Sequence, residues 1–144
     1  KTISRAEFVT MLVKAFNLEP ASGIVFEDTS SHWAREYVAS AAGNGIVSGW
    51  GENEFRPEEP VTREQMAIMI YKAAKLLPVK SDSPAFTDRS DISSWAGEAV
   101  SAVSVNGLMQ GYPDGSFRPR QTADRAQAVT VVAKALSALA GELK

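Results

Sequence analysis

The sequence predicts an all-α protein built from tandem helix-loop-helix repeats. Two observations carry this prediction: an internal repeat with a period of about 60 residues, and apolar residues that recur at helical spacing at the end of each repeat. The chain has 144 residues, of which 44% are apolar, which is enough for a substantial core without disulfides. Because repeat units of this kind bury their apolar faces against one another, we expect one packed body.

The repeat is visible at positions that are mostly Gly, Pro and aromatic. Phe26, Asp28, Trp33, Gly45, Gly49, Phe55, Pro57 and Arg63 recur as Phe86, Asp88, Trp95, Gly107, Gly111, Phe117, Pro119 and Arg125. The spacing is 60 residues for the first two pairs and 62 from the Trp onward. Residues 4–7 match residues 62–65, so only the last helix of a further copy precedes the first full unit. We therefore expect the end of a truncated unit at 1–20, a second unit at 24–77 and a third at 84–144.

Each full unit is expected to open with an aromatic-x-Asp turn and a short helix. The residues spaced for one helical face are Trp33, Ala34, Tyr37, Val38 and Ala41, and then Trp95, Ala96, Ala99, Val100 and Val103. We interpret Trp33 and Trp95 as core anchors, with stacking on a sugar ring as the alternative because both stand at the start of a helix. The Asn-Gly pairs at 44–45 and 106–107 end the two helices, because glycine readily adopts the left-handed conformation.

A glycine-rich loop follows in each unit, over 49–57 and 111–119, with Phe55 or Phe117 expected to plug it onto the core. A short pair of β-strands within this loop is an alternative expectation. A longer helix then closes the unit. Its inward residues are predicted to be Phe8, Met11, Leu12, Ala15 and Phe16, then Met66, Met69, Ile70, Ala73 and Ala74, then Ala128, Val131, Val132, Ala135 and Leu136. Linkers are expected at 19–23 and 77–84.

Composition excludes several classes of function. With 15 Lys and Arg against 17 Asp and Glu, the chain has a net charge of −2 and therefore no overall positive potential that would attract nucleic acid. There is no cysteine and a single histidine, His32, which we interpret as a surface residue, so we expect no metal site and no cofactor. The longest apolar stretch, Val129 to Leu139, is interrupted by Lys134, so we expect no membrane insertion.

Arginine stands at the first position of all three closing helices, as Arg5, Arg63 and Arg125. Each follows the first residue of a predicted capping box: Ser4 with Glu7, Thr62 with Gln65, and Asp124 with Gln127. A cation there faces the positive end of the helix dipole, at a cost of about 0.3–1 kcal/mol. Two explanations stay open: a small-anion site formed by the guanidinium and free N–H groups, or an ion pair with a structural carboxylate, for which Asp28 and Asp88 are the obvious partners.

The glycine-rich loops also carry aromatic residues, Trp50 and Tyr112. The apolar faces of sugar rings stack on such side chains. These two residues are therefore candidate ligand contacts.

The order Phe-x-Asp, Trp, Gly-Ile/Leu-x-x-Gly, Phe-x-Pro and Thr-Arg-Glu-Gln resembles the S-layer homology (SLH) domain. Residues 24–75 and 84–137 match whole units, and residues 3–17 match the end of one. The resemblance implies a pseudo-threefold, three-pronged body around a central helical bundle. It also implies an extracellular, noncatalytic anchor at the cell wall that binds secondary cell wall polysaccharide, typically a glycan with pyruvate ketals on N-acetylmannosamine.

The resemblance assigns roles by motif. Arg5, Arg63 and Arg125 match the arginine of the family's Thr-Arg-Ala-Glu motif. Asp28 and Asp88 match the acid of its Phe-x-Asp motif. Gly49 and Gly111 match a glycine that lets the backbone approach the glycan closely. With the two loop aromatics, the implied ligand-binding set is Arg5, Arg63, Arg125, Asp28, Asp88, Gly49, Gly111, Trp50 and Tyr112. The last motif departs from the family, because Asp124 stands where Thr is usual and is expected to weaken a site at Arg125.

Two other functions compete with a glycan anchor. The truncated first unit would leave an apolar face that pairs with another copy of the chain, which makes a protein-assembly module the alternative. An enzyme acting on wall glycan would use a pair of carboxylates, drawn from Asp28, Asp88, Asp114 and Glu52. We disfavour the enzyme, because these acids recur with the repeat whereas an active site usually breaks repeat symmetry.

Overall fold

A computed structural model describes residues 1–18, 25–48, 53–78 and 86–142, and it confirms the all-α prediction. The described residues form five α-helices: α1 (Arg5–Ala15), α2 (Arg35–Gly43), α3 (Arg63–Ala73), α4 (Gly97–Val105) and α5 (Arg125–Glu142). Two short 3-10 helices, Glu27–Thr29 and Arg89–Asp91, follow the two Phe-x-Asp openings.

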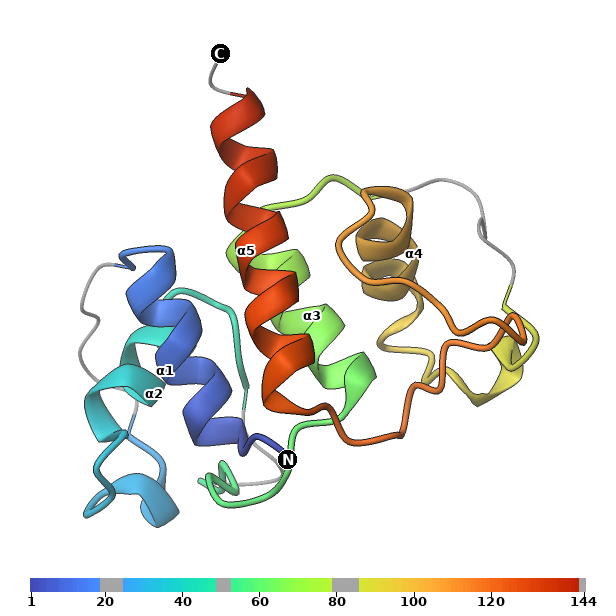
Figure 1. The fold of residues 1–144 in the computed structure, drawn as a ribbon. Coiled ribbons are helices and arrows are strands. Elements are labelled where there is room, and N and C mark those ends of the chain that lie inside the picture. The colour runs from blue at the N-terminus through green and yellow to red at the C-terminus, as the bar shows by residue number, and fades with distance from the viewer. Residues whose placement is uncertain (19–24, 49–52, 79–85, 143–144) are drawn as a thin grey trace.

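The three closing helices form the centre of the molecule. Helices α1, α3 and α5 contact one another pairwise, while α2 packs on α1 and α4 packs on α3 (Figure 1). The first helix of each full unit therefore covers the closing helix of the unit before it. This arrangement explains why a single repeat cannot form a core by itself.

A closed ring of backbone hydrogen bonds joins the three units just before the central helices begin. Val61 N donates to Ile3 O at 2.9 Å, Ala123 N donates to Val61 O at 2.9 Å, and Ile3 N donates to Ala123 O at 3.3 Å. All three residues occupy the same position of the repeat and are fully buried. Isolated β-bridges between units form at this ring.

The phenylalanines of the glycine-rich loops fill the core as predicted. Phe55 and Phe117 are completely buried, as is Phe8 of α1. Each loop phenylalanine lies beside the aromatic that opens its unit, with ring centroids 5.6 Å apart for Phe26 and Phe55 and 5.2 Å for Phe86 and Phe117. Aromatic pairs of this kind contribute about 0.5–1.5 kcal/mol beyond the area they bury.

The helix ends follow the local sequence. Two complete capping boxes begin α1 and α3, in which Glu7 N donates to Ser4 Oγ and Gln65 N to Thr62 Oγ1 while the Glu7 and Gln65 side chains accept from the cap backbone. At α5 only the forward half is present, with Gln127 N donating to Asp124 Oδ1 at 2.8 Å. The glycines that end α2 and α4 have φ values of +76° and +71°, which confirms their predicted role.

The interpretation of Trp33 and Trp95 as core anchors is wrong. Their exposed fractions are 61% and 59%. The helices begin two residues later than the apolar pattern suggests, at Arg35 and Gly97, so each Trp lies on the turn before its helix and the following alanine is buried instead.

The outer side of α5 also differs from the prediction. Leu136, expected to point inward, is 37% exposed, and Val129 is 56% exposed. The equivalent residues of α3, Ala67 and Ala74, are 0% and 5% exposed because α4 covers them. Within the described ranges no outer helix packs on α5 in the way that α2 and α4 pack on α1 and α3.

Candidate ligand grooves between the repeats

Two of the three arginines hold the loop of the following unit. Arg5 Nε donates to Phe55 O at 3.0 Å, and Arg63 Nε donates to Phe117 O at 2.8 Å. Arg63 Nη2 also donates to Gln110 O at 2.8 Å. Each guanidinium lies over the ring of the same phenylalanine, 4.6 Å and 4.7 Å from the centroid. These carbonyls offset part of the unfavourable dipole interaction, since hydrogen bonds from charged donors contribute about 1.5–3 kcal/mol each.

Both arginines are buried, with only 4% and 5% of their surface exposed. Burial lowers the pKa of Arg5 to about 10, against which the carboxylates of Glu59 and Asp28 act to raise it. Burial likewise lowers the pKa of Arg63. The grooves described below are therefore lined by guanidinium groups whose charge is poorly solvated, and such groups gain from an approaching anion.

The two Phe-x-Asp acids hold the same loops from the other side. Asp28 accepts hydrogen bonds from Phe55 N at 2.9 Å and Arg56 N at 2.8 Å. Asp88 accepts from the equivalent atoms, Phe117 N at 2.9 Å and Arg118 N at 2.8 Å. Both arginines of these loops have positive φ, 62° and 57°, so the carboxylate stabilises a strained turn. Neither acid lines either of the two grooves described below.

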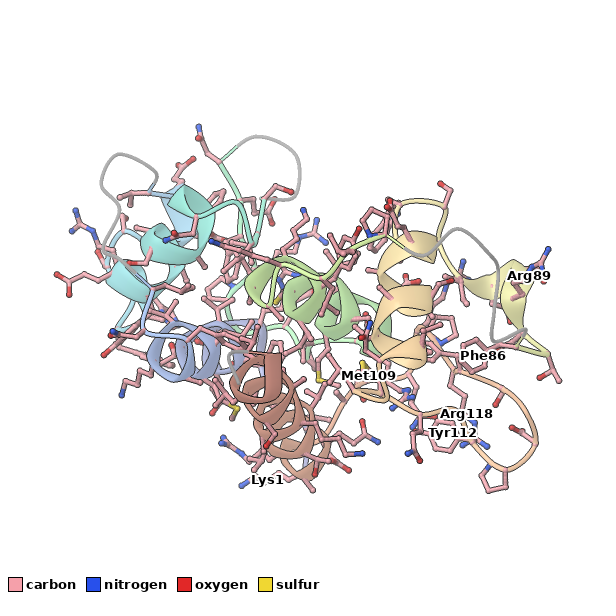
Figure 2. All side chains as sticks on the ribbon, turned by 90° about the horizontal axis from the view of Figure 1, so that it is seen from above. Lys1, Phe86, Arg89, Met109, Tyr112 and Arg118 are labelled. Carbon is pink, nitrogen blue, oxygen red and sulfur yellow. The ribbon has the colours of Figure 1, made fainter. Side chains whose placement is uncertain are left out.

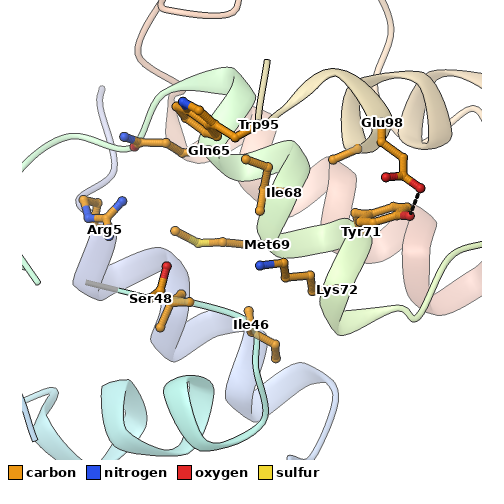
Figure 3. A pocket seen from close by; sticks show the side chains of 12 residues that line it. Arg5, Ile46, Ser48, Gln65, Ile68, Met69, Tyr71, Lys72, Trp95 and Glu98 are labelled. Carbon is orange, nitrogen blue, oxygen red and sulfur yellow. Dashed lines mark hydrogen bonds between the residues drawn. The ribbon is translucent and has the colours of Figure 1, made fainter. Parts of the chain in front are cut away.

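Groove 1 lies between the loop after α2, helix α3 and the start of α4, and has a volume of about 430 Å³. Arg5 and Lys72 line it together with Gln65, Trp95 and Glu98, and Figure 3 shows these side chains around the apolar floor made by α3. The floor and remaining walls consist of Ile46, Val47, Ser48, Ile68, Met69, Tyr71 and Ala99. Glu98 accepts a hydrogen bond from the hydroxyl of Tyr71 at 3.0 Å. One groove thus combines two cations with an exposed indole.

A buried glutamate fixes the wall of groove 1. Glu64 of α3 is 4% exposed and accepts from Ser93 N at 3.0 Å and from Ser93 Oγ at 2.7 Å. Ser93 lies two residues before Trp95, so this contact holds the turn that carries the indole. Glu64 therefore positions Trp95 from inside the core.

Groove 2 occupies the equivalent place one repeat later and measures about 350 Å³. Its arginine is Arg63, its lysine is Lys134 and its glutamine is Gln127, and Tyr112 and Asp124 also line it. The remaining lining residues are Met66, Leu108, Met109, Gln110, Ala126, Thr130 and Val131. All of them come from α3, the loop after α4, or α5, so the wall that α4 gives groove 1 has no counterpart among them.

Tyr112 lies between two arginines at the edge of groove 2. Its ring centroid is 4.8 Å from the Arg63 guanidinium carbon and 3.8 Å from that of Arg118. Its hydroxyl accepts from Gln121 Nε2 at 3.0 Å and from Gln127 Nε2 at 3.4 Å. Figure 2 shows Tyr112 and Arg118 side by side at this edge.

Gly111 has a packing reason of its own. A Cβ atom added there would lie 2.7 Å from Phe86 Cε1 and 2.9 Å from Ser116 O, so no larger residue fits without movement. The equivalent loop candidates of the preceding unit, Gly49 and Trp50, lie outside the described residues.

Arg125 is placed differently from its two equivalents. Its side chain is about half exposed, forms an ion pair with Glu7, and lines neither groove. Its backbone N donates to Lys1 O at 3.0 Å. The structure therefore separates Arg125 from the other two arginines.

Sequence reasoning missed Lys72 and Glu64 as groove residues, and it preferred a core position for Trp95 over a ligand contact. For the lysine a signal was available, because Lys14, Lys72 and Lys134 occupy the same position of the three closing helices. For Trp95 the helical pattern was misleading, since it extended the helix over the preceding turn. Glu64 sits beside an arginine in a capping motif, and nothing local indicates that it reaches Ser93.

Searches of the described residues for two other kinds of site were negative. They contain no group of three or more His, Cys, Asp or Glu side chains arranged to hold a metal ion. None of the described helices is both long and apolar enough to cross a membrane.

Comparison with known proteins identifies the family. The S-layer homology domain model matches residues 25–67 and 85–129. The chain is 36% identical over 140 residues to an endoglucanase of Bacillus sp. (strain KSM-635), covering 94% of this chain and 15% of the enzyme. It is 32% identical over 112 residues to the surface-layer 125 kDa protein of Lysinibacillus sphaericus, covering 77% of this chain and 9% of that protein.

A third relative is the cellulosome-anchoring protein of Acetivibrio thermocellus, 28% identical over 142 residues, which cover 93% of this chain and 32% of the relative. The chain thus spans a small part of the length of each relative. The relatives include surface-layer and cell-surface proteins, which places the chain at the extracellular cell surface. By its repeats, its fold and this match, the chain belongs to the S-layer homology domain family.

Proposed function

We propose that the chain is a noncatalytic module that anchors a protein to the cell wall by binding secondary cell wall polysaccharide in the grooves between its repeats. The family and the names of the surface-layer and cellulosome-anchoring relatives support wall anchoring. The finer statement, that the ligand is a glycan with pyruvate ketals on N-acetylmannosamine, rests on the chemistry of groove 1.

The observation that carries the proposal is a buried cation that lines the same groove as an exposed indole. Arg5 is buried in the wall of groove 1, with 4% of its surface exposed, whereas Trp95 in the same groove is 59% exposed. A guanidinium matches the planar geometry of a carboxylate, and an indole face suits the apolar side of a sugar ring. A ketal carboxylate on a pyranose presents both features in one small group, and Lys72 supplies a second cation in the same groove.

The carboxylates of the described loops favour a noncatalytic role. Asp28 and Asp88 are engaged by backbone N–H groups. Hydrogen bonds from Ser116 lower the pKa of Asp114, which is the opposite of the raised pKa that a general acid needs. Glu52 lies outside the described residues.

The test is co-sedimentation of the chain with Gram-positive cell walls, before and after acid removes the polysaccharide, with pyruvylated N-acetylmannosamine as competitor. We expect pelleting that disappears on stripping and on competition.

Arg5→Ala is a poor first variant, because it also removes the hydrogen bond to Phe55 O. Trp95→Ala changes an exposed side chain, and Trp33→Ala is its matched control, equally exposed but outside both grooves.

We expect Trp95→Ala to weaken wall binding about tenfold and Trp33→Ala to leave it unchanged, with equal melting temperatures. Stacking contacts contribute about 0.5–1.5 kcal/mol plus the buried area, which is consistent with that factor. Pelleting that survives acid stripping of the walls would contradict glycan anchoring.

A second candidate, self-association, is favoured by the outer side of α5. Val129 and Leu136 are exposed there, whereas their equivalents on α3 are covered by α4. If a second copy covers this side, the mass measured by light scattering rises with concentration and Val129→Lys abolishes the rise. A strict monomer at high concentration would exclude this function.

A further inference from the structure

We propose that groove 2 continues into a third groove beside the end of α4, and that this third groove binds the sugar next to the acidic one in the same polysaccharide chain. This inference rests on the proposed function and adds to it that one side of the molecule holds a segment of the glycan longer than a single sugar. The additional cavity is called groove 3.

Groove 3 lies between the end of α4 and the second half of α5, where the loop that follows α4 turns toward α5 (Figure 1). Its volume is about 350 Å³, the same as that of groove 2. Leu108 and Lys134 line both grooves, so the two cavities adjoin. The lining of groove 3 consists of Asn106, Gly107, Leu108, Ala133, Lys134, Ser137 and Ala138.

The two grooves together follow α5. Their lining residues on this helix begin with Ala126 in groove 2 and end with Ala138 in groove 3, which is roughly 18 Å along the helix axis at about 1.5 Å per residue. This length exceeds that of one pyranose ring. A ligand that occupies both grooves is therefore an oligosaccharide.

Groove 3 exists because the third unit has small residues where the second unit has large ones. The residue of α3 that corresponds to Ala133 is Tyr71, which packs against the core. The residue that corresponds to Ala138 is Leu76, which also packs against the core, after α3 has ended. In the third unit the helix continues past both positions and both alanines are exposed. The two alanines therefore leave room on α5 that larger side chains take up in the second unit.

Lys134 stands where the two grooves meet. No acid is among the described residues that line groove 3, and groove 2 has one acid, Asp124, beside Arg63 and Lys134. The lining of both grooves together is therefore net positive, which is complementary to a polysaccharide that carries carboxylates. The Lys134 ammonium is exposed and has three donors. It can contact the acidic sugar in groove 2 and a hydroxyl of the neighbouring sugar in groove 3.

The other residues of groove 3 suit a neutral sugar ring. Leu108, Ala133 and Ala138 offer apolar surface to the C–H face of such a ring. The Nδ2 atom of Asn106 donates to a backbone carbonyl of α4 at 2.8 Å, and the amide oxygen is not used in that bond. This oxygen and the Ser137 hydroxyl can accept hydrogen bonds from sugar hydroxyls. An apolar floor with a few polar groups is typical of small-molecule sites.

The first test is titration calorimetry with two ligands: the methyl glycoside of pyruvylated N-acetylmannosamine, and a trisaccharide that contains this sugar, released from the wall polysaccharide. We expect the wild-type chain to bind the trisaccharide about tenfold more tightly than the methyl glycoside at one site per chain, since one or two further hydrogen bonds correspond to a factor of this size. Equal affinities for the two ligands would overturn the inference. A chain that binds neither ligand would instead contradict the proposed function.

Filling groove 3 assigns the gain in affinity to this groove. Ala133→Tyr with Ala138→Leu places the residues of the second unit on α5, at two exposed positions. We expect this double variant to bind both ligands with the affinity that the wild type has for the methyl glycoside, within twofold. Val129→Tyr is the matched control, because Val129 is exposed on α5 and lines none of the three grooves, and it should keep the tenfold gain. A gain that survives filling would refute binding in groove 3.

A second measurement needs no variant. In ¹H–¹⁵N correlation spectra of the wild-type chain, the trisaccharide should shift the amide signals of Gly107 and Ser137, and the methyl glycoside should leave them in place. Signals of these two residues that respond to neither ligand would likewise overturn the proposal.

Discussion

Arg5 and Arg63 stand where helix energetics disfavour a cation, and both are buried there. Both donate hydrogen bonds to carbonyl oxygens of the next repeat, at 2.8–3.0 Å, which the sequence did not offer as partners. The contact was not predictable from the chain, because a backbone carbonyl more than 45 residues away has no residue identity to recognise. The repetition of an unfavourable arginine did indicate that something beyond the helix compensates.

The buried Arg5 makes stability depend on pH at the alkaline end. Its pKa is about 10 in the folded chain, well below the value of an ordinary guanidinium, so between these two values the unfolded chain binds more protons. Stability therefore carries a constant penalty below pH 10, and this penalty is relieved as the pH rises above 10. Relative to Arg5→Met, the wild type should gain about 1 kcal/mol between pH 9 and pH 11. Urea unfolding of both proteins at the two pH values measures this difference, and an unchanged difference would argue against a desolvated Arg5.

At the scale of single elements, the ends of the helices could be predicted from the sequence, whereas the loops could be predicted only in part. The capping boxes of α1 and α3 and the glycines that end α2 and α4 have local signatures, and all are found where predicted. The apolar pattern failed at Trp33 and Trp95, because a residue on the turn before a helix falls on the same spacing as the helix face. At Trp95 the turn is also held by the contact of Ser93 with Glu64, which is not local.

The Phe-x-Asp acids are expected to stabilise their loops. Asp88→Ala leaves the N–H groups of Phe117 and Arg118 without their acceptor, which should lower the free energy of unfolding by about 2–3 kcal/mol. Asp91→Ala is the control, since Asp91 is exposed and lies three residues away on the same turn. Thermal unfolding followed by circular dichroism compares the two. Equal melting temperatures of the two variants would mean that the Asp88 carboxylate does not stabilise this loop.

For the whole molecule, the pseudo-threefold arrangement was implied by the family resemblance, and the three central helices in mutual contact confirm a helical bundle. Two grooves with unequal walls were not foreseeable, because they depend on which outer helix covers which central helix. Val129 is exposed although its repeat position is buried in α1 and α3, where Val9 and Ala67 are 0% exposed. Identical positions in a repeat therefore acquire different surroundings.

The units should unfold together. Each loop is held by the arginine of the preceding unit, and the ring through Ile3, Val61 and Ala123 joins all three. Removing one unit from its place would expose the apolar faces of its neighbours, so intermediates are disfavoured. Calorimetry should give one transition whose van't Hoff and calorimetric enthalpies agree. Two separated transitions would show that the repeats are independent.

The ring of backbone hydrogen bonds also determines how the molecule carries tension. Residue 142 lies at the far end of α5, whereas Lys1 accepts from Arg125 N beside its first turn (Figure 1). A pull on the far end of α5 runs along the helix axis, about 27 Å for its 18 residues, and reaches the ring at the opposite end. Force then shears α5 against α1 and α3 over its packed length instead of peeling one turn at a time. A wall anchor under load is thereby strained across many contacts at once.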